Sequence, residues 1–501
     1  MPTAPHVPEA DETDSVLGAL RTPRRLRTEV LGGLVVALAL IPEAISFSII
    51  AGVDPRLGLF ASFTMAVSIA VLGGRPAMIS AATGAIALVV APVAREYGVD
   101  HLLATVILGG LIQVVLGLLG VARLMRFIPR SVMVGFVNAL AILIFVAQLP
   151  HLRDVPWAVY PLVAVGLVIV FALPRLTDVV PAPLVAIVLL TAFTVVAAVT
   201  VPTVGDQGEL PERLPTLLLP DVPLTLETLR VIAPFALAMA LVGLLESLLT
   251  AKLVDDVTDT HSDKTRESWG QGAANIITGF FGGMGGCAMI GQTMINVKAS
   301  GARTRISTFL AGVFLLALVV GLGDLVAVIP MAALVAVMIL VAISTFDWHS
   351  VRPSTLRRMP RSETTVMLAT VVVTVVSHNL AYGVGVGVLV AMVAFARRVA
   401  HLTDVTRLDP TDDHTRVYAV TGELFFASSN DLVYQFDYAG DPADVVIDLS
   451  GAHVWDASSV AALDAITTKY AARGTTVTIT GLDPDSARRH RQLAGRLGAG
   501  H

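Results

Sequence analysis

The feature that most constrains this chain is a succession of apolar segments that runs from about Leu26 to Ala400. Each segment is close to the roughly 20 residues that an α-helix needs to cross a bilayer. Only 15% of the 501 residues are charged, against about 25% in soluble globular chains. The pattern predicts a polytopic α-helical membrane protein and excludes a soluble enzyme, a nucleic-acid-binding protein and a disordered scaffold.

Apolar runs bounded by charged residues predict about fourteen membrane spans. We expect these spans near residues 29–49, 56–72, 77–92, 101–121, 127–149, 157–173, 181–200, 228–250, 267–281, 288–297, 304–322, 325–343, 364–378 and 382–399.

The positively charged residues predict the orientation of the chain. Of the 26 Lys and Arg residues before residue 401, 21 fall in loops on the side of the N-terminus and 5 in loops on the other side. The positive-inside rule makes the richer side cytoplasmic, and an even number of spans returns the C-terminal region to that side. Residues 1–20 lack the basic start of a cleavable signal peptide. We expect a multi-pass protein of the bacterial inner membrane with both termini in the cytoplasm.

The composition divides the chain into four parts. Residues 1–25 form a polar cytoplasmic segment, and residues 26–400 form the transmembrane domain. An Asp-rich linker at residues 401–415 leads to a soluble α/β domain at residues 416–501. In that domain the pattern predicts strands at residues 416–420, 424–426, 445–449 and 477–479 and a helix at residues 458–472.

Two of the apolar segments follow glycine-rich approaches. GGRP at residues 73–76 precedes AMISAATG at 77–84, and GGMGG at 282–286 precedes CAMIGQT at 287–293. Irregular backbone at membrane depth is tolerated only where it lines a protein cavity. A helix that starts there presents unpaired N–H groups and the positive end of its dipole. Such helix ends bind anions without any basic side chain.

The same two segments take part in an internal repeat. Ala77-Met78-Ile79 resembles Ala288-Met289-Ile290 at an offset of 211 residues, and Leu40–Glu43 resembles Gly243–Glu246 at an offset of 203. The matches predict two halves of seven spans, which are inverted because seven is odd. Interrupted segments of inverted repeats meet near the bilayer midplane, so we expect a substrate site between the helix starts at Ala81–Gly84 and Ala288–Gln292. The candidate substrate-binding residues are Phe47, Ala81, Thr83, Gly84, Ala288, Met289, Gly291 and Gln292.

Two carboxylates, Glu43 beside Pro42 and Glu246, lie in the middle of apolar segments. A carboxylate at that depth is costly and marks an ion pathway or a proton relay, so we predict that both residues couple transport to an ion. The alternative is structural, with hydrogen bonds to backbone groups freed by Pro42 or at the half-helix ends. The only cysteine, Cys287, excludes a disulfide framework and a Cys-based zinc site and is interpreted as a small buried hydrophobe. We expect no metal, no cofactor and no enzyme activity.

Several motifs resemble those of the SulP anion transporters, the group related to solute carrier family 26. They are Ile41–Ser48 (IPEAISFS), Glu246–Thr250 (ESLLT), Gly270–Asn275 (GQGAAN) followed by Gly282-Gly283, and Asn296–Lys298 (NVK). The resemblance runs from about residue 25 to the end of the chain. It implies fourteen spans in two inverted repeats of seven, with a core domain (segments 1–4 and 8–11) and a gate domain (segments 5–7 and 12–14). It also implies an elevator-like motion of core against gate, and a homodimer.

The C-terminal part resembles a STAS domain, the regulatory module that commonly follows SulP transporters. The resemblance rests on Ile447–Ser450 (IDLS) and Trp455–Ser459 (WDASS). In the related anti-sigma-factor antagonists a phosphorylated Ser directly follows the Asp, and here Ala457 stands at that position. The resemblance therefore does not imply a phosphorylation switch.

The function that we expect is secondary active transport of small anions of the sulfate, bicarbonate or dicarboxylate class, with proton symport. The resemblance implies proton coupling at Glu43. Met289 and Ile290 stand where sodium-coupled relatives use hydroxyls, and Gln292 stands where many vertebrate members carry Arg. The alternatives are a sodium-coupled bicarbonate transporter, an anion exchanger, a nucleobase-type permease, and a membrane sensor with the STAS domain as output. The expected partners are the anion, a proton or sodium, the lipid bilayer and a second copy of the chain, without nucleic acid.

Overall fold

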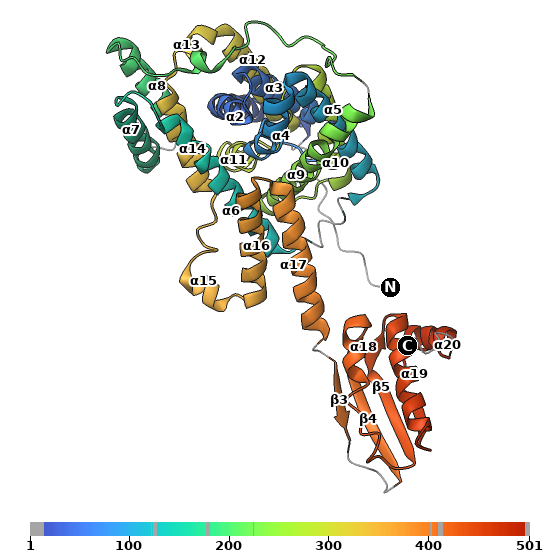
Figure 1. Cartoon of the computed structure of the whole chain (residues 1–501). Helices are drawn as coiled ribbons and strands as arrows, with labels where there is room; N and C mark the ends of the chain where they lie inside the picture. Colours follow the sequence, from blue (N-terminus) through green and yellow to red (C-terminus); the bar gives the residue numbers. More distant parts are fainter. Residues whose placement is uncertain are drawn as a thin grey trace. The chain divides into compact units, whose positions relative to one another are not determined.

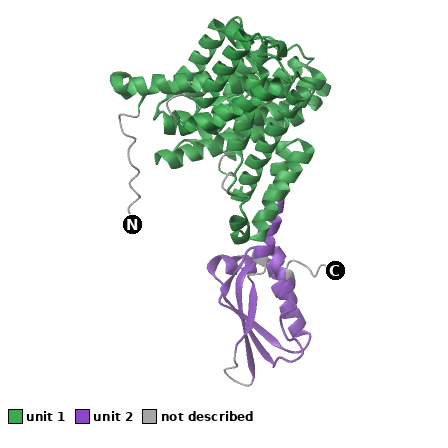
Figure 2. Cartoon of the chain, turned by 90° about the vertical axis from the view of Figure 1, so that its left-hand side faces the viewer, with its two compact units in different colours: residues 1–388 green, residues 389–501 purple. Residues whose placement is uncertain are grey.

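The computed structural model describes residues 15–121, 123, 128–176, 181–223, 225–400, 403–408 and 414–495. The chain divides into two compact units, residues 1–388 and 389–501 (Figure 2). Parts of the predicted N-terminal segment and linker, together with the last six residues, lie outside the described residues.

Unit 1 is built almost entirely from helices. Each of the fourteen predicted segments contains a helix, and within the described residues six helical stretches are long and apolar enough to cross a membrane. The number of spans stays a prediction. The helices are α1 (Val16–Arg21), α2 (Pro23–Ala51), α3 (Pro55–Leu72), α4 (Gly84–Tyr97), α5 (Val99–Leu118), α6 (Arg130–Val146), α7 (Val159–Ala172), α8 (Ala182–Val196), α9 (Leu226–Thr258), α10 (Lys264–Phe280), α11 (Ile290–Met294), α12 (Arg305–Gly321), α13 (Gly323–Ala327), α14 (Met331–Thr345), α15 (Pro353–Arg358), α16 (Arg361–Ser377) and α17 (Leu380–Ala400), the last of which continues into unit 2.

The helices of unit 1 form two packed groups (Figure 1). Helices α2–α5 pack with α9–α12, and helices α6–α8 pack with α14 and α16. This division matches the predicted core and gate. Small residues allow the closest approach in the core, because a methyl group at Gly110 of α5 would lie 2.6 Å from the carbonyl oxygen of Gly272 in α10. Membrane helices commonly use such residues where their backbones meet.

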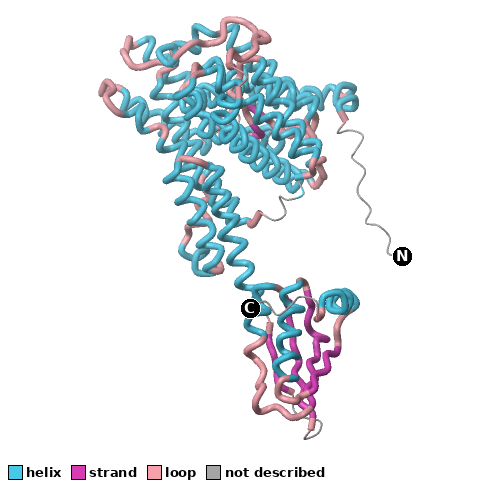
Figure 3. The backbone as a smooth tube through the Cα atoms, turned by 45° about the vertical axis from the view of Figure 1, so that its right-hand side comes forward, coloured by secondary structure: helices cyan, strands magenta, loops and turns pink. Residues whose placement is uncertain are grey.

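Two very short strands lie inside the core, where the sequence predicts interrupted helices (Figure 3). β1 (Ser80–Ala81) pairs antiparallel with β2 (Cys287–Ala288), and Ser80 lies opposite Ala288. The first residues of the two strands, Ser80 and Cys287, are 207 positions apart, and the first residues of α4 and α11, Gly84 and Ile290, are 206 positions apart. The Ala-Met-Ile resemblance at an offset of 211 does not align these elements with one another.

The approach to β1 is fixed by ion pairs and backbone contacts. Arg75 donates from Nη1 to Asp255 at 3.0 Å and from Nη2 to Thr258 at 2.6 Å. Oε2 of Glu267 accepts the backbone N–H groups of Gly74 at 2.8 Å and of Arg75 at 2.9 Å. The glycine-rich loop after α3 is thus tied to α9 and α10, which gives β1 and α4 a fixed starting point.

Unit 2 contains a four-stranded mixed sheet of β3 (Asp404–Arg407), β4 (Thr415–Leu424), β5 (Asp444–Val454) and β6 (Thr476–Thr480) in that order, with helices α18 (Phe426–Leu432), α19 (Ala457–Ala471) and α20 (Pro484–Leu493). β3 is antiparallel to β4, whereas β4, β5 and β6 are parallel. The residues expected to form a linker thus contribute the edge strand β3. The strand predicted at 424–426 is wrong, because β4 ends at Leu424 and Phe426 begins α18.

A buried carboxylate organises the core of this α/β unit. Oδ2 of Asp441 accepts the hydroxyls of Tyr418 in β4 at 2.7 Å and of Tyr470 in α19 at 2.6 Å. Burial, together with these hydrogen bonds to Asp441, raises the pKa of both phenols. The neutral tyrosines therefore tie the helix to the sheet throughout the physiological pH range.

Candidate functional site

A cavity of about 250 Å³ lies between the two helix groups of unit 1. Its walls come from α2, the start of α4, α9 and α11 on the core side, and from α6, α8 and α14 on the gate side. Pockets for drug-sized ligands measure about 300–1,000 Å³, so this volume suits a small solute. Its lining residues are Glu43, Phe47, Thr83, Gly84, Phe136, Val137, Leu140, Ile144, Pro183, Glu246, Leu249, Met289, Ile290, Gly291, Gln292, Ile295, Leu340, Val341, Ser344 and Thr345.

The structure brings together eight of the ten residues that the sequence nominates. The residues that line the cavity are Glu43, Phe47, Thr83, Gly84, Glu246, Met289, Gly291 and Gln292. Ala81 and Ala288 are not among the lining residues, because they form the β1–β2 pair, where both are fully buried. These two alanines lie behind the cavity wall and set the direction from which the chain enters α4 and α11.

The start of α4 is capped by its own chain. Thr83 has an extended backbone, and its hydroxyl accepts the N–H of Ile86 at 3.3 Å, as an N-cap residue does. Gly84 follows at a point of close approach. A methyl group there would lie 2.9 Å from Cε1 of Phe47 and 3.1 Å from Cδ1 of Ile144.

The start of α11 is more open. Met289 precedes the helix and provides no side-chain cap, so the N–H groups of the first turn have no acceptor within the helix. Apart from its two chain neighbours and the backbone of its own helix, no atom lies within 4 Å of a methyl group placed on Gly291. The helix continues as a π-helix over Ile295–Ala299, a geometry that is frequent at functional sites.

The two carboxylates make crossed contacts between the repeats. Glu43 in α2, from the first half, lines the cavity beside Gln292 in α11, from the second half. Oε2 of Glu246 in α9, from the second half, accepts Sγ of Cys287 at 3.0 Å, and Cys287 lies 3.1 Å from the hydroxyl oxygen of Thr83 in the first half. Cys287 is buried, as expected, but it is a hydrogen-bonding group and not only a small hydrophobe.

Polar side chains of α10 hold the strand pair behind these contacts. Nε2 of Gln271 donates to Ser80 Oγ at 2.7 Å. The Asn275 side chain donates to the carbonyl of Gly286 at 3.0 Å and accepts its N–H at 2.9 Å. The GQGAAN motif therefore works as a support, because it fixes β1 and β2 from the same helix.

The gate side of the cavity contains lining residues that the sequence does not predict. The gate residues that line the cavity are Phe136, Val137, Leu140 and Ile144 of α6, Pro183 of α8, and Leu340, Val341, Ser344 and Thr345 of α14. No sequence signal marks them, because α6, α8 and α14 are apolar along most of their length and the face that meets the cavity depends on tertiary packing.

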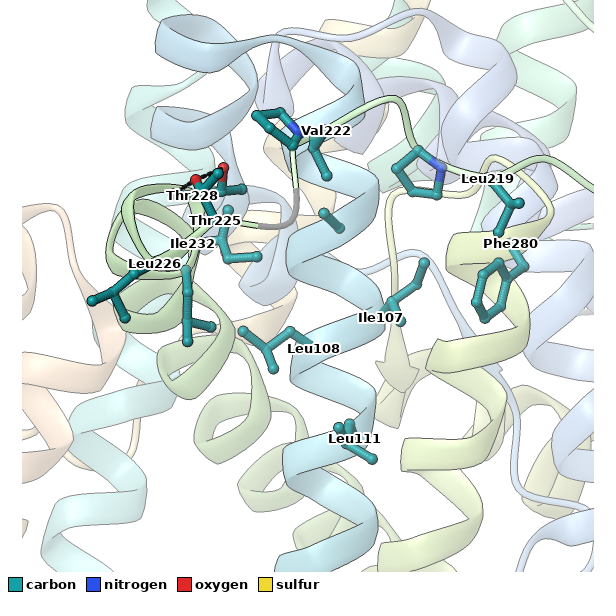
Figure 4. Close-up of a pocket in the computed structure, with 14 residues that line it drawn as sticks. Ile107, Leu108, Leu111, Leu219, Val222, Thr225, Leu226, Thr228, Ile232 and Phe280 are labelled. Carbon is teal, nitrogen blue, oxygen red and sulfur yellow. Dashed lines mark hydrogen bonds between the residues drawn. The ribbon is translucent and has the colours of Figure 1, made fainter.

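A larger pocket of about 780 Å³ lies elsewhere in unit 1, between α5, the start of α9 with the chain before it, and the end of α10 (Figure 4). Its lining is almost entirely apolar, with Leu108, Ile232 and Phe280 among the side chains shown. Its polar side chains, Thr225 and Thr228, lie 3.2 Å apart between their hydroxyl oxygens. Its lining contains no charged residue, so it holds no carboxylate that could carry a proton.

Comparison with known protein families identifies both units. The model described as the sulfate permease family matches residues 26–160 and 153–370. The chain belongs to the sulfate permease family. Members of this family are membrane transporters of small anions and not enzymes, which confirms the predicted class. The model of the STAS domain matches residues 387–495.

Individual relatives agree with this assignment. The chain is 53% identical to the "Putative sulfate transporter YbaR" of Bacillus subtilis, over 94% of this chain and 97% of the relative. It is 26% identical to the "Bicarbonate transporter BicA" of a Picosynechococcus species, over 85% of this chain and 83% of the relative.

Solved structures confirm the predicted fold. The inward-facing structure of the murine Solute Carrier 26 family member A9 anion transporter superposes with a TM-score of 0.81 at 16% identity, covering 93% of this chain and 87% of that one. The transmembrane domain of a cyanobacterial bicarbonate transporter BicA superposes with a TM-score of 0.64 at 25% identity, covering 74% of this chain and 98% of that one. The fold is therefore that of a membrane transporter followed by a STAS domain.

Proposed function

We propose that this protein is a proton-coupled secondary transporter of small anions of the sulfate, bicarbonate or dicarboxylate class, and that the anion binds in the cavity between the starts of α4 and α11. The observation that carries the proposal is the composition of the cavity wall. Two helix starts and two carboxylates face a small space whose lining residues include no Lys, Arg or His. The names of the sulfate and bicarbonate transporters among the relatives support the same substrate class.

Anion binding would rest on backbone and not on charged side chains. Each helix N-terminus acts like roughly half a positive charge, and its free N–H groups point along the helix axis toward a ligand. Two such ends that face one cavity attract an anion. The cavity lining contains no basic side chain that would bind the anion too tightly for release. The apolar side chains of α6 and α14 on the opposite wall keep water away from the bound anion.

The cavity wall also supports a mechanism of alternating access. One side belongs to the core group and the other to the gate group, so a movement of core against gate would carry the anion site along the wall formed by α6 and α14. An elevator-like motion is therefore part of the proposal, with Glu43, Glu246 and both helix starts travelling together in the core.

The surroundings of Glu246 favour a proton over sodium as the coupling ion. Its side-chain hydrogen-bond partner is the thiol of Cys287, and the neighbouring positions carry the apolar side chains of Met289 and Ile290. Hard cations are bound by oxygen ligands and not by thiols. A carboxyl group in such surroundings can hold a proton without further ligands, and so can Glu43 beside Gln292.

The test is uptake of sulfate and bicarbonate into proteoliposomes with separately imposed pH, sodium and voltage gradients. We expect a pH gradient alone to drive accumulation by the wild type. Glu43→Gln should abolish this accumulation while leaving anion exchange measurable, because the variant cannot carry a proton. Glu227→Gln, in the exposed first turn of α9, is the matched control. Concentration of substrate by Glu43→Gln under a pH gradient alone would show that another group carries the proton.

We also propose that the transmembrane domain comprises residues 26–400 and that the STAS domain includes the edge strand β3 within residues 401–415. In this proposal the protein is a homodimer, and both termini lie in the cytoplasm. The STAS domain is not required for the transport step in this proposal. A chain truncated after residue 402 should fold and transport at an altered rate, measured in the same proteoliposomes. A folded truncate without any transport would contradict this part.

A further inference from the structure

The geometry points to a switchable hydrogen-bond relay, Glu246–Cys287–Thr83, that links proton uptake at Glu246 to hydrogen-bond donation into the anion cavity. Cys287 is the positioning residue of this relay. The inference rests on the proposed function, since it explains how proton and anion binding would favour each other at the same site.

Each group of the relay has a fixed number of hydrogen-bond donors and acceptors. The N–H of Ile86 can only donate, and it donates to Thr83 Oγ1 at 3.3 Å. Thr83 Oγ1 lies 3.1 Å from Cys287 Sγ, which lies 3.0 Å from Glu246 Oε2. The hydroxyl and the thiol each own one hydrogen and can accept others. The direction of the chain is therefore decided at its far end by Glu246.

With Glu246 ionised, the carboxylate can only accept. Cys287 then donates its hydrogen to Glu246, and Thr83 donates its own hydrogen to the sulfur. The threonine hydroxyl has no hydrogen left for the cavity and presents only lone pairs there. A bound anion next to Thr83 would meet no donor from this side chain.

With a proton bound at Glu246 Oε2, the chain can run the other way. The carboxyl O–H donates to the sulfur, the S–H donates to Thr83 Oγ1, and the threonine hydrogen turns toward the cavity that Thr83 lines. The only covalent change is the new O–H bond at Glu246, and the other hydrogens rotate about bonds that they keep. An anion in the cavity gains one hydrogen bond in this state.

Few other titratable or polar side chains lie close to the three residues of the relay. Glu43 is the other titratable residue in the cavity lining, and it contacts Gln292 instead. Helix α5 faces this region with the neutral Gln113, which hydrogen-bonds to Asn275 of α10 and to the carbonyl of Ala240 in α9. The Glu267 carboxylate of α10 accepts the N–H groups of Gly74 and Arg75 at the far end of the strand pair. Cys287 is the one side chain that reaches the Glu246 carboxylate among the described residues.

The relay predicts mutual reinforcement of the two ligands. A hydrogen bond to a charged ligand is worth about tenfold in affinity, so protonation of Glu246 should raise the apparent anion affinity by about that factor. By linkage, the anion should raise the proton affinity of Glu246 by the same factor. A purely structural cysteine would change neither quantity.

The first test uses the single thiol of the chain as a probe. The infrared S–H stretching band of the purified full-length protein is followed through a pH titration without added anion. We expect the band to move as Glu246 titrates, because the acceptor changes from a carboxylate to a hydroxyl, and to stay fixed in Glu246→Gln. A band in the wild type that ignores pH overturns the relay whether or not the protein transports.

The second test measures the pH dependence of KM for sulfate uptake in proteoliposomes. As the pH rises through the titration of Glu246, KM should rise about tenfold in the wild type and in Cys287→Ser, which has the same donor and acceptor inventory. Cys287→Ala should lose this tenfold rise. Thr83→Ser and Thr83→Val form a second matched pair if Cys287→Ala does not fold. A full pH response of KM in both Cys287→Ala and Thr83→Val overturns the relay. A pH-sensitive S–H band and a pH-dependent KM, without any accumulation of sulfate driven by a pH gradient, leave the relay standing and overturn the proposed proton coupling.

Discussion

The two helices that meet at the cavity begin in different ways. The start of α4 is closed by the Thr83 cap and packed against Phe47 and Ile144 at Gly84. The start of α11 has no side-chain cap, and the space beside Gly291 is open. The halves of the repeat share a fold but not a role. The first half supplies a rigid, capped end with an adjustable hydroxyl, and the second half leaves backbone N–H groups open to a ligand.

The largest expected effect comes from filling the closed end. Gly84→Ala should lower the Tm and abolish transport, because the new methyl group would overlap Phe47 and Ile144. Overpacking of this kind costs about 1–3 kcal/mol. Thermal unfolding of the purified protein and proteoliposome uptake measure the two effects. Normal Tm and normal transport would show that the start of α4 is not closed.

A charge at the start of α11, the open end, should change the selectivity between divalent and monovalent anions. Gln292→Arg adds a positive charge beside the free N–H groups of α11, so the affinity for divalent anions should rise relative to that for monovalent anions by about tenfold, or about 1.4 kcal/mol. Gln292→Glu should shift the ratio in the opposite direction. Competition of sulfate, chloride and bicarbonate for uptake measures the ratio. Unchanged ratios in both variants would place the anion elsewhere.

A methyl group at the open end is the counterpart of Gly84→Ala. Gly291→Ala should leave the Tm unchanged or higher, since alanine is favoured over glycine in a helix by about 1 kcal/mol. The methyl group would occupy space next to the exposed N–H groups, so KM should rise several-fold while the protein stays folded. If Gly291→Ala and Gly84→Ala had the same effects on Tm and KM, the two helix starts would be equivalent.

The smallest expected effect is on the labelling rate of the Cys287 thiol, which lies between the two helix starts. Cys287 is fully buried behind the cavity wall, so a maleimide should react slowly, and more slowly when a transported anion fills the cavity. A cysteine introduced at Ser458, which is exposed in unit 2, should react fast and ignore the anion. Rapid labelling of Cys287, or labelling unaffected by any transported anion, would show that the thiol does not lie beside the anion site.

Much of the membrane architecture follows from patterns along the chain. The lengths of the apolar runs predict where the helices lie, because every backbone polar group in a bilayer must be paired within a helix. The glycine-rich approaches at residues 73–76 and 282–286 mark the two interruptions, since a regular helix would not carry them. Glu43 and Glu246 stand out because a carboxylate is so rarely placed in an apolar segment.

Other features depend on residues that are far apart in the sequence. The pairing of Ser80 with Ala288 and of Ala81 with Cys287 joins residues 208 and 206 positions apart, and a short local resemblance cannot predict such a pairing. The same pairing covers Ala81 and Ala288 and leaves Thr83, Met289 and Gly291 facing the cavity.

Residue type and spacing along one chain are enough to predict the apolar segments, the two interruptions, the inverted repeat and the two carboxylates of this transporter. Tertiary packing is needed to form the gate wall of α6 and α14, to place Glu43 beside Gln292, and to build the bridge that Cys287 makes between Glu246 and Thr83. Hydrogen bonds and cavity walls form between side chains on different elements. Their partners are set by how the helices pack, which no local pattern encodes.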